Sequence, residues 1–265
     1  MSRRNGTTLR GAMEKSLQFL KRVASPQLEM MRWLYVSTVI SVLAAMIAIL
    51  RSRSTPTQLT ISEDIDFDFS YLVLQWPGSF CNLERPCCDP KSGKPAVNFT
   101  IHGLWPQLKR GKFPEYCDPT EFHLTEIADL VPELNQCWPS LSCPTTDSTG
   151  FWKHEWERHG SCSSLNQHDY FEKTLALLNS VDLLKALQGA GMEPNTENTY
   201  DVLDVQHALR HSIGKTPGVQ CNKRQTQLFQ IYICVDLHAE NFIECPNYPD
   251  GRCLPKIHWP IFQQS

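Results

Sequence analysis

The chain has 265 residues, of which 41% are apolar and 20% are charged, and this composition excludes an intrinsically disordered protein. Its charge is unevenly distributed. Residues 1–55 contain nine Lys or Arg and two Asp or Glu, whereas the rest of the chain contains 16 basic and 26 acidic side chains, a net charge of −10 with His neutral. Such a body does not bind nucleic acid through bulk charge. Protonation of several of the nine His at mildly acidic pH would reduce this charge, which favours an acidic working environment.

The 11 cysteines all lie between Cys81 and Cys253. In a secreted chain this pattern indicates a disulfide framework with one thiol left over. A metal protein is the alternative, but Cys87 and Cys88 are adjacent and no CxxC pair occurs, so the ligand spacing of structural zinc is absent from the sequence. We therefore expect no metal and no other cofactor.

Residues 1–32 are polar and basic and predict an unstructured N-terminal leader. Residues 33–50 contain no charged side chain and are flanked by Arg32 and Arg51; their length is at the lower limit for a membrane span and long for the apolar region of a signal peptide. Because the basic excess precedes them, the body is expected on the far side of the membrane. A cleaved signal peptide and an uncleaved signal anchor remain alternatives. Both send the body into the secretory pathway, to the extracellular space, the vacuole or the ER lumen. Residues 51–66 predict a linker.

The remainder, residues 67–265, is predicted to be one domain in which strands and helices are interspersed. Strand-forming residues predict strands at 67–75 and 98–104, and a β-hairpin at 227–235 and 241–245. Apolar residues at helical spacing predict helices at residues 120–136 and 170–187, and two further helices are predicted at 151–162 and 201–213. Since regular βαβ alternation is absent from this order, we predict a disulfide-linked α+β fold with a central antiparallel sheet and several helices.

The segment FWKHEWERHGSC concentrates ionisable side chains on one side of a predicted helix. At about 100° per residue, His154, Glu155, Arg158 and His159 share an arc of roughly 140°. Trp156 falls on the opposite side, where it can anchor the helix in a core. Proton carriers near neutral pH combined with fixed positive charge are what a phosphate-handling site needs.

A further histidine, His102, is predicted at the end of a strand, where the following Gly103 lets it be held rigidly toward a cleft. Taken alone, it could equally be a hydrogen-bonded histidine of the core. Two histidines on separate rigid elements, however, supply what cleavage of RNA without a metal requires. One takes the proton of the 2′-OH and the other protonates the leaving 5′-oxygen, while positive charge stabilises the phosphate as its negative charge builds.

Two other hydrolytic chemistries fit less well. The zinc-hydrolase pattern places two His at positions i and i+4 on a helix, whereas His154 and His159 are at i and i+5, about 140° apart. A serine nucleophile is not indicated either, because no GxSxG motif occurs.

Several segments together resemble the T2 family of secreted ribonucleases, in particular its plant S-like branch. NFTIHGLWP at residues 98–106 and FWKHEWERHGSC at 151–162 resemble the two active-site segments of that family. The similarity also includes four shorter segments: LQWPGSFC at 74–81, ERPCC at 84–88, WPSLSC at 138–143 and QIYICVD at 230–236. It thus spans about residues 67–255, nearly the whole body.

The resemblance implies a monomeric endoribonuclease that turns over single-stranded RNA without a metal, through a 2′,3′-cyclic phosphate to a 3′-phosphate. It implies that His159 is the general base, that His102 is the general acid, and that His154 binds phosphate. Glu155 and Arg158 would stabilise the transition state. Arg158 departs from the Lys usual in the family, and we expect activity to survive with an altered rate.

The resemblance also assigns base-binding residues. Gln75, Trp105 and Phe151 match positions that hold or stack on bases, and Phe113 fills a stacking position where relatives often carry Tyr. For Trp105 and Phe151, plain core packing is the alternative.

Five disulfides are implied by the resemblance: Cys81–Cys87, Cys88–Cys143, Cys117–Cys162, Cys221–Cys253 and Cys234–Cys245. Cys137 is then left over, either buried and inert or available to cross-link two chains. Asn98 begins an Asn-Phe-Thr triplet that predicts a glycosylation site.

Two other functions use the same fold. A self-incompatibility-type recognition ribonuclease is one, but such relatives tend to be basic, unlike this body. A catalytically silent storage or defence protein is the other, and the presence of His102, Glu155 and His159 argues against it.

Overall fold

The computed structural model describes residues 14–16, 18–19, 29–44, 46, 67–82, 87–93, 96–110, 113–144, 147–249 and 252–262. The chain divides into two compact units, Met1–Ile61 and Ser62–Ser265, which we describe separately. In the first unit, residues 29–44 are helical and their side chains are exposed. No helix within the described residues is long and apolar enough to cross a membrane. The predicted linker and parts of the predicted leader and apolar segment lie outside the described residues.

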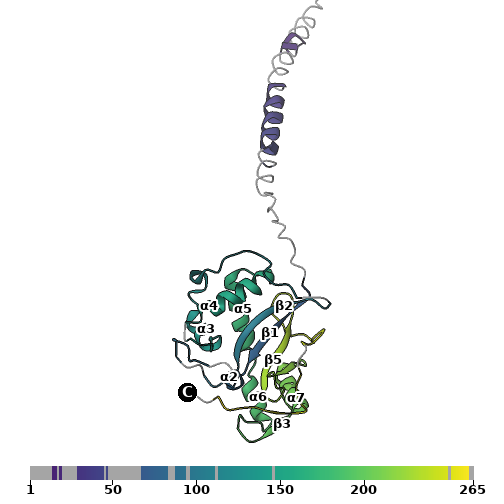
Figure 1. Cartoon of the computed structure of the whole chain (residues 1–265). Helices are drawn as coiled ribbons and strands as arrows, with labels where there is room; N and C mark the ends of the chain where they lie inside the picture. Colours follow the sequence, from purple (N-terminus) through teal and green to yellow (C-terminus); the bar gives the residue numbers. More distant parts are fainter. Residues whose placement is uncertain are drawn as a thin grey trace, which may run out of the picture. The chain divides into compact units, whose positions relative to one another are not determined.

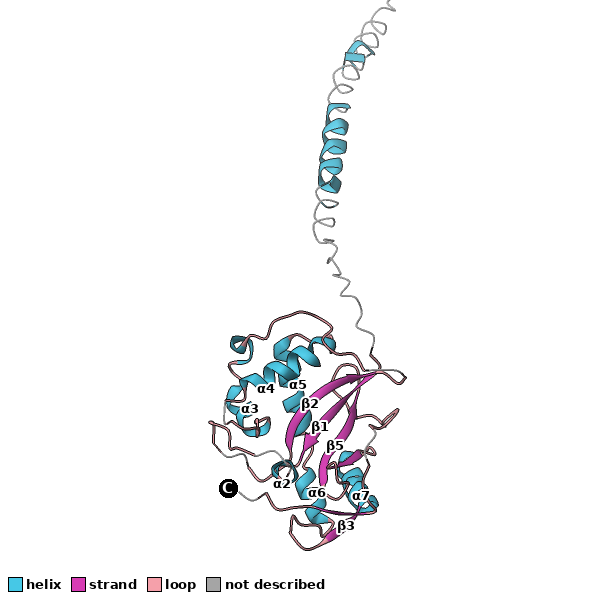
Figure 2. Cartoon of the chain, viewed as in Figure 1, coloured by secondary structure: helices cyan, strands magenta, loops and turns pink. Residues whose placement is uncertain are grey.

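The second unit is built on a four-stranded antiparallel sheet (Figures 1 and 2). Its strand order is β2-β1-β5-β4, where the strands are β1 (Phe69–Gln75), β2 (Thr100–Gln107), β4 (Gly218–Cys221) and β5 (Leu228–Val235). A smaller antiparallel pair joins β3 (Thr199–Asp201) to β6 (Lys256–His258). The predicted α+β fold with a central antiparallel sheet is confirmed.

The helices gather in two groups around this sheet. Figure 1 shows α3, α4 and α5 together on one side, with α6 and α7 near the other end of the strands. Their bounds are α2 (Pro77–Cys81), α3 (Val131–Cys137), α4 (Thr149–Arg158), α5 (Gln167–Asn179), α6 (Leu183–Gly189) and α7 (Val202–Ile213). Two short 3₁₀ helices are η1 (Leu124–Ile127) and η2 (Gly160–Cys162).

Three helices predicted as continuous are divided. Residues 151–162 form most of α4 and then η2, with His159 between them. Residues 120–136 form η1 and then α3. Pro132 lies in the first turn of α3, where its missing N–H is tolerated. Further inside a helix the same residue would remove a backbone hydrogen bond, so α3 begins close to Pro132 and does not continue from η1. Residues 170–187 form parts of α5 and α6. The side chain of Asp182 accepts a hydrogen bond from the Lys185 amide and so begins a new helix.

The predicted β-hairpin is wrong. Within the described part of the chain, residues 241–245 form no strand, and Phe242 makes an isolated bridge to Val235. The neighbours of β5 are instead β1 and β4, the second of which was not predicted. Residues 241–245 are nevertheless tied to β5 by the Cys234–Cys245 disulfide.

The core lies on both faces of β1, whose seven residues are all buried. Leu72 and Leu74 belong to a large apolar cluster shared with the helices. Tyr71 and Val73 belong to a smaller cluster on the opposite face, together with Tyr232 of β5. Alternate side chains of a strand point to opposite faces, so this strand supports two layers at once.

All five implied disulfides are present: Cys81–Cys87, Cys88–Cys143, Cys117–Cys162, Cys221–Cys253 and Cys234–Cys245. Cys137 is the remaining thiol, and it is partly buried. Each cross-link contributes roughly 2–4 kcal/mol to the free energy of unfolding.

Candidate active site

A cavity of about 490 Å³ lies between the sheet and α4. It brings together seven of the nine predicted catalytic and RNA-binding residues: His102, Trp105, Phe113, His154, Glu155, Arg158 and His159. Four further residues complete its lining: Tyr71, Gln107, Tyr232 and Pro249. Side chains predicted from two separate sequence segments therefore face one space.

His102 lies at a β-bulge inside β2 and not, as predicted, at the end of a strand. The register of β1 against β2 shifts between Val73 and Leu74, and none of the described residues of β1 is opposite His102. Ile101 and Leu104 are both fully buried in the same core cluster, which regular two-residue alternation would not allow without an extra residue between them. Such a bulge re-aims the local side chains, and here it presents His102 to the cavity.

Contacts on several sides hold the His102 ring. The Gln230 amide from β5 meets Nδ1, and the Trp105 ring packs edge-on at 4.9 Å. Nε2 faces the cavity side, 3.9 Å from Glu155 Oε1. The His102 carbonyl accepts a hydrogen bond from Trp138 Nε1 at 2.9 Å, which fixes the backbone as well.

Glu155 is the buried carboxyl group of the site, with 1% of its surface exposed. Its Oε2 accepts a hydrogen bond of 2.8 Å from Trp105 Nε1, so α4 is joined directly to β2. This contact requires glycine at position 103, because a Cβ there would overlap both Glu155 Oε2 and Trp105 Nε1. The Gly-Leu-Trp order after His102 thus follows from the packing of the site.

His159 follows the last residue of α4 and is buried, with 5% of its surface exposed. Its amide donates to the Glu155 carbonyl at 3.0 Å, which keeps its backbone close to helical. Its ring stacks on Trp105 with centroids 5.0 Å apart. Nδ1 is buried and has no hydrogen-bond partner among the described residues. Gly160 follows because a Cβ there would collide with the Trp156 ring.

Arg158 and His154 form the more exposed side of the cavity, and Arg158 carries its fixed positive charge. The Arg158 Nε donates a hydrogen bond of 2.9 Å to Oε2 of Glu115, which lies in the loop before Cys117. A cation in the last turn of a helix also interacts favourably with the helix dipole. Burial lowers the pKa of His154, and the Arg158 charge adds to this effect.

The site shifts the pKa values of its buried groups. Burial, with the charges of His154 and Arg158, lowers the pKa of His102 to about 4. Burial and Arg158 likewise lower the pKa of His159 to about 3, and burial raises the pKa of Glu155 to about 8. Burial therefore favours the neutral rings of His102 and His159 and the protonated carboxyl group of Glu155 in the free protein. A phosphate entering the cavity would raise the pKa of both imidazoles.

The predicted base-binding residues are not all brought together. Trp105 and Phe113 line the cavity, and 43% of Phe113 is exposed. Phe151 lies beside the His102 ring at 5.8 Å but does not line this cavity. Gln75 is 3% exposed and does not line it either.

Several residues of the site were not predicted from sequence. Tyr71 and Tyr232 alternate with core residues on neighbouring strands, a signal that two-residue periodicity could have given. Gln230 lies within the QIYICVD segment already noted for its resemblance. No pattern in the sequence indicates Glu115, because only the folded loop that carries it brings it next to Arg158.

Fold and site define a class: disulfide-linked α+β proteins in which imidazoles from a sheet and a helix face one cavity. Residues 67–245 match the family model of the Ribonuclease T2 family, and the chain belongs to this family.

Its similarity to individual relatives covers the same region. The chain is 47% identical over 204 residues to extracellular ribonuclease LE of Solanum lycopersicum, covering 74% of this chain and 88% of that one. It is 45% identical over 205 residues to intracellular ribonuclease LX of the same species, covering 76% and 86%. The crystal structure of RNase NT in complex with 5′-AMP superposes with a TM-score of 0.72 at 42% identity, over 74% of this chain and all of that one.

Proposed function

We propose that this protein is an endoribonuclease that cleaves single-stranded RNA by metal-independent transesterification. The observation that carries the proposal is that His102 and His159 both pack against the Trp105 indole, with ring centroids 4.9 and 5.0 Å from it, and both line one cavity. A phosphodiester bound in that cavity can contact both rings.

In the first step, His159 accepts the proton of the ribose 2′-OH and the 2′-oxygen attacks phosphorus. The bond from phosphorus to the 5′-oxygen breaks, and His102 donates its Nε2 proton to that oxygen. The products are a 2′,3′-cyclic phosphate and a free 5′-hydroxyl. In the second step the two histidines exchange roles, and water opens the cyclic phosphate to a 3′-phosphate.

The remaining groups stabilise charge. Arg158 and His154 lie where they can contact phosphate oxygens as negative charge builds. Glu155, kept protonated by burial, can donate a hydrogen bond to the same oxygens from Oε1, while Oε2 accepts from Trp105. The low dielectric around the buried Glu155 strengthens its contacts.

For the substrate we propose single-stranded RNA, whose bases can stack on exposed aromatic rings. The proposed base contacts are Trp105 and Phe113, which line the cavity, Phe151, which lies beside the His102 ring, and Gln75. Stacking has little base specificity. The complex of the related RNase NT with 5′-AMP supports a nucleotide ligand.

The proposal is tested with yeast RNA at about pH 5, with and without EDTA, followed by chromatography of the first product. We expect equal cleavage in both samples and a 2′,3′-cyclic phosphate as the first product. Cleavage abolished by EDTA, or a first product with a 5′-phosphate, would refute the mechanism.

For its biological setting we propose RNA turnover within the secretory pathway, by a monomeric domain comprising residues 67–265. Five disulfides and an exposed Asn98 within its glycosylation triplet support passage through an oxidising compartment. Two relatives are named extracellular and intracellular, so the final compartment differs within the family. Mass spectrometry of the mature N-terminus distinguishes removal of residues 33–50 from their retention as an anchor.

A further inference from the structure

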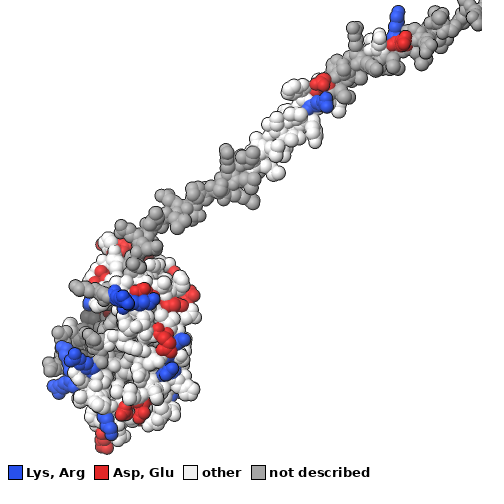
Figure 3. Space-filling model, turned by 90° about the vertical axis from the view of Figure 1, so that its right-hand side faces the viewer, with Lys and Arg blue, Asp and Glu red and all other residues white. Residues whose placement is uncertain are grey.

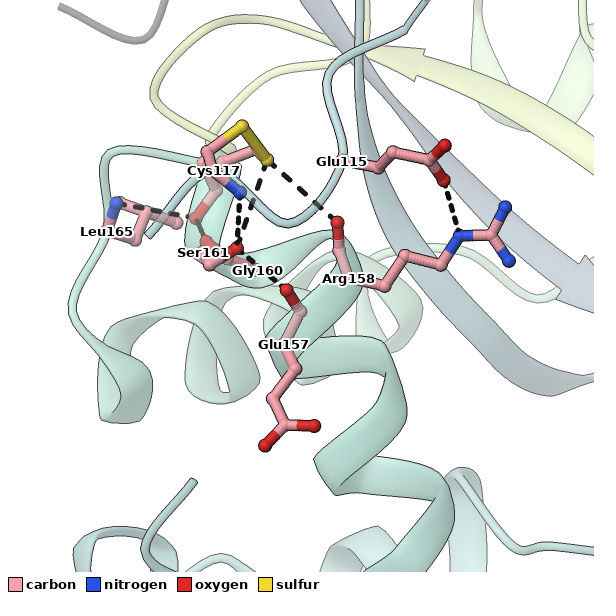
Figure 4. The surroundings of a disulfide bond; sticks show 9 residues. Glu115, Cys117, Glu157, Arg158, Gly160, Ser161 and Leu165 are labelled. Atoms are coloured by element: carbon pink, nitrogen blue, oxygen red, sulfur yellow. Dashed lines mark hydrogen bonds and ion pairs between the residues drawn. A yellow bond between two sulfur atoms is a disulfide. The ribbon is translucent and has the colours of Figure 1, made fainter. Parts of the chain in front are cut away.

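Arg158, the fixed cation of the site, is held by a carboxylate from outside the cavity. Its Nε lies 2.9 Å from Glu115 Oε2, in a hydrogen-bonded ion pair (Figure 4). Arg158 lines the cavity, whereas Glu115 is not among the described residues that do so. The carboxylate therefore engages the inner nitrogen of the guanidinium. The two terminal amino groups remain for an acceptor within the cavity.

Glu115 is itself held in place by the two residues that follow it. The Tyr116 amide donates to the Arg158 carbonyl at 2.9 Å, and Cys117 is cross-linked to Cys162 just beyond α4. Figure 4 shows the disulfide and the ion pair beside the same helix end. Because the loop is fixed to the turn that presents Arg158, the pair loses less conformational entropy on forming than two free surface side chains would.

We propose that Glu115 is a positioning residue, which orients Arg158 so that its terminal amino groups face the substrate phosphate. A guanidinium presents separate bonding edges and can satisfy a carboxylate and a phosphate together. An ammonium is a compact point charge for which the two anions would compete. The inference rests on the proposed ribonuclease function. If Glu115 has this role, the effect of replacing it on kcat depends on whether position 158 carries Arg or Lys.

The same pair sets the charge that the imidazoles experience. Arg158 contributes to the lowered pKa values of His102, His154 and His159. Removing the Glu115 charge leaves this cation less compensated, so the three pKa values should fall further. The other titratable groups around the cavity are Glu155 on α4 and, on the sheet, Tyr71 and Tyr232.

The decisive experiment is a double-mutant cycle of Glu115→Gln and Arg158→Lys, measured as kcat and KM on a short RNA. In the parent, Glu115→Gln should lower kcat about threefold, the scale expected for a partly exposed ion pair. It should also move the midpoint of the pH profile of kcat/KM to lower pH. In the Arg158→Lys background the same substitution should raise kcat, because the ammonium is released from its competitor. An equal effect in both backgrounds, or none, overturns the inference.

Glu121→Gln is the matched control, since it removes the same charge from an exposed position after Cys117. It should leave kcat and the pH profile unchanged in both backgrounds; a shift equal to that of Glu115→Gln would mean that the change in net charge alone causes the effect.

The double-mutant cycle is repeated with the dissociation constant of 5′-AMP, measured by calorimetry. If the parent cleaves no RNA, the proposed function fails. The 5′-AMP cycle then decides alone: a reversal of sign supports the positioning role, and no reversal refutes it.

Discussion

His102 and His159 face the same cavity from different surroundings. His159 is stacked against Trp105 and is 5% exposed, which favours the neutral ring that a general base requires. The His102 side chain is 30% exposed, so the protonated ring of a general acid loses less hydration there than it would at the more buried His159. These surroundings support the proposed division of roles.

Replacement of either histidine by alanine tests these roles. We expect His102→Ala and His159→Ala each to reduce formation of the cyclic phosphate by at least about a hundredfold, since each removes one proton transfer. Chromatography of the products measures the loss, and near-UV circular dichroism checks that the fold survives. Near-parental activity in a folded variant would show that the assigned roles are wrong.

Glu155 should make stability depend on pH. Its pKa is raised by burial from 4.5 to about 8, so between these values the folded state binds more protons than the unfolded state. Its contribution is complete below about pH 4.5 and is lost as the pH rises toward 8. Glu155→Gln keeps an acceptor for Trp105 and removes the titration.

We therefore expect the melting temperature of Glu155→Gln, relative to the parent, to rise steadily over that pH range. Thermal denaturation followed by circular dichroism at several pH values measures the difference. A difference that stays constant or falls with pH would contradict a raised pKa.

At the scale of elements, the site depends on the approach of β2 to α4. β2 can contain Pro106 because it lies at the edge of the sheet, where a missing N–H removes no bond to a further strand. Its bulge turns His102 toward α4, and Gly103 lets the Trp105 indole reach Glu155. The geometry of the proposed catalytic groups is thus a consequence of strand register and close packing.

Gly103→Ala tests this contact. The new Cβ would occupy the position where Trp105 Nε1 meets Glu155 Oε2. We expect a loss of roughly 1–3 kcal/mol in the free energy of unfolding, with at least about a tenfold loss of kcat from displaced catalytic groups. Urea denaturation and RNA cleavage measure the two effects.

Gly150→Ala in α4 is the matched control, because a Cβ there would meet no described atom within 4 Å apart from its chain neighbours and the backbone of its own helix. It should leave kcat unchanged and stabilise the helix by up to about 1 kcal/mol. Equal losses in both variants would mean that Gly103 is not specifically required.

At the scale of the whole molecule, residues 62–265 carry a net charge of −10. On the face shown in Figure 3, basic and acidic side chains of this unit are interspersed. Positive charge at the cavity comes from Arg158 and from whichever histidines are protonated. RNA binding should therefore be local and release of cleaved product easy.

The affinity for RNA should depend weakly on salt. With about two phosphates neutralised, we expect the affinity of unit Ser62–Ser265 for single-stranded RNA to fall less than about tenfold between roughly 50 and 200 mM salt. Fluorescence anisotropy with a 2′-O-methyl RNA, which lacks the attacking hydroxyl, measures this slope. A much steeper slope would indicate an extended basic binding surface.

The sequence by itself determined the local arrangement of the site. His154, Glu155 and Arg158 share one side of α4, because helical geometry is fixed by the spacing of neighbouring residues. His159 follows the last residue of the helix, and all four side chains line the cavity. The α+β class followed from the order of strands and helices. The resemblance, and not the spacing of the cysteines, supplied the disulfide pairs.

Only the tertiary structure decided what depends on residues distant in sequence. The bulge at His102 follows from the register of β2 against β1, which no local pattern fixes. The pairing of Glu115 with Arg158 depends on a loop brought to the helix end by the Cys117–Cys162 disulfide. The periodicity of a sequence determines which side of its own helix or strand each residue occupies. Strand register and loop position depend on packing between elements that are distant in sequence.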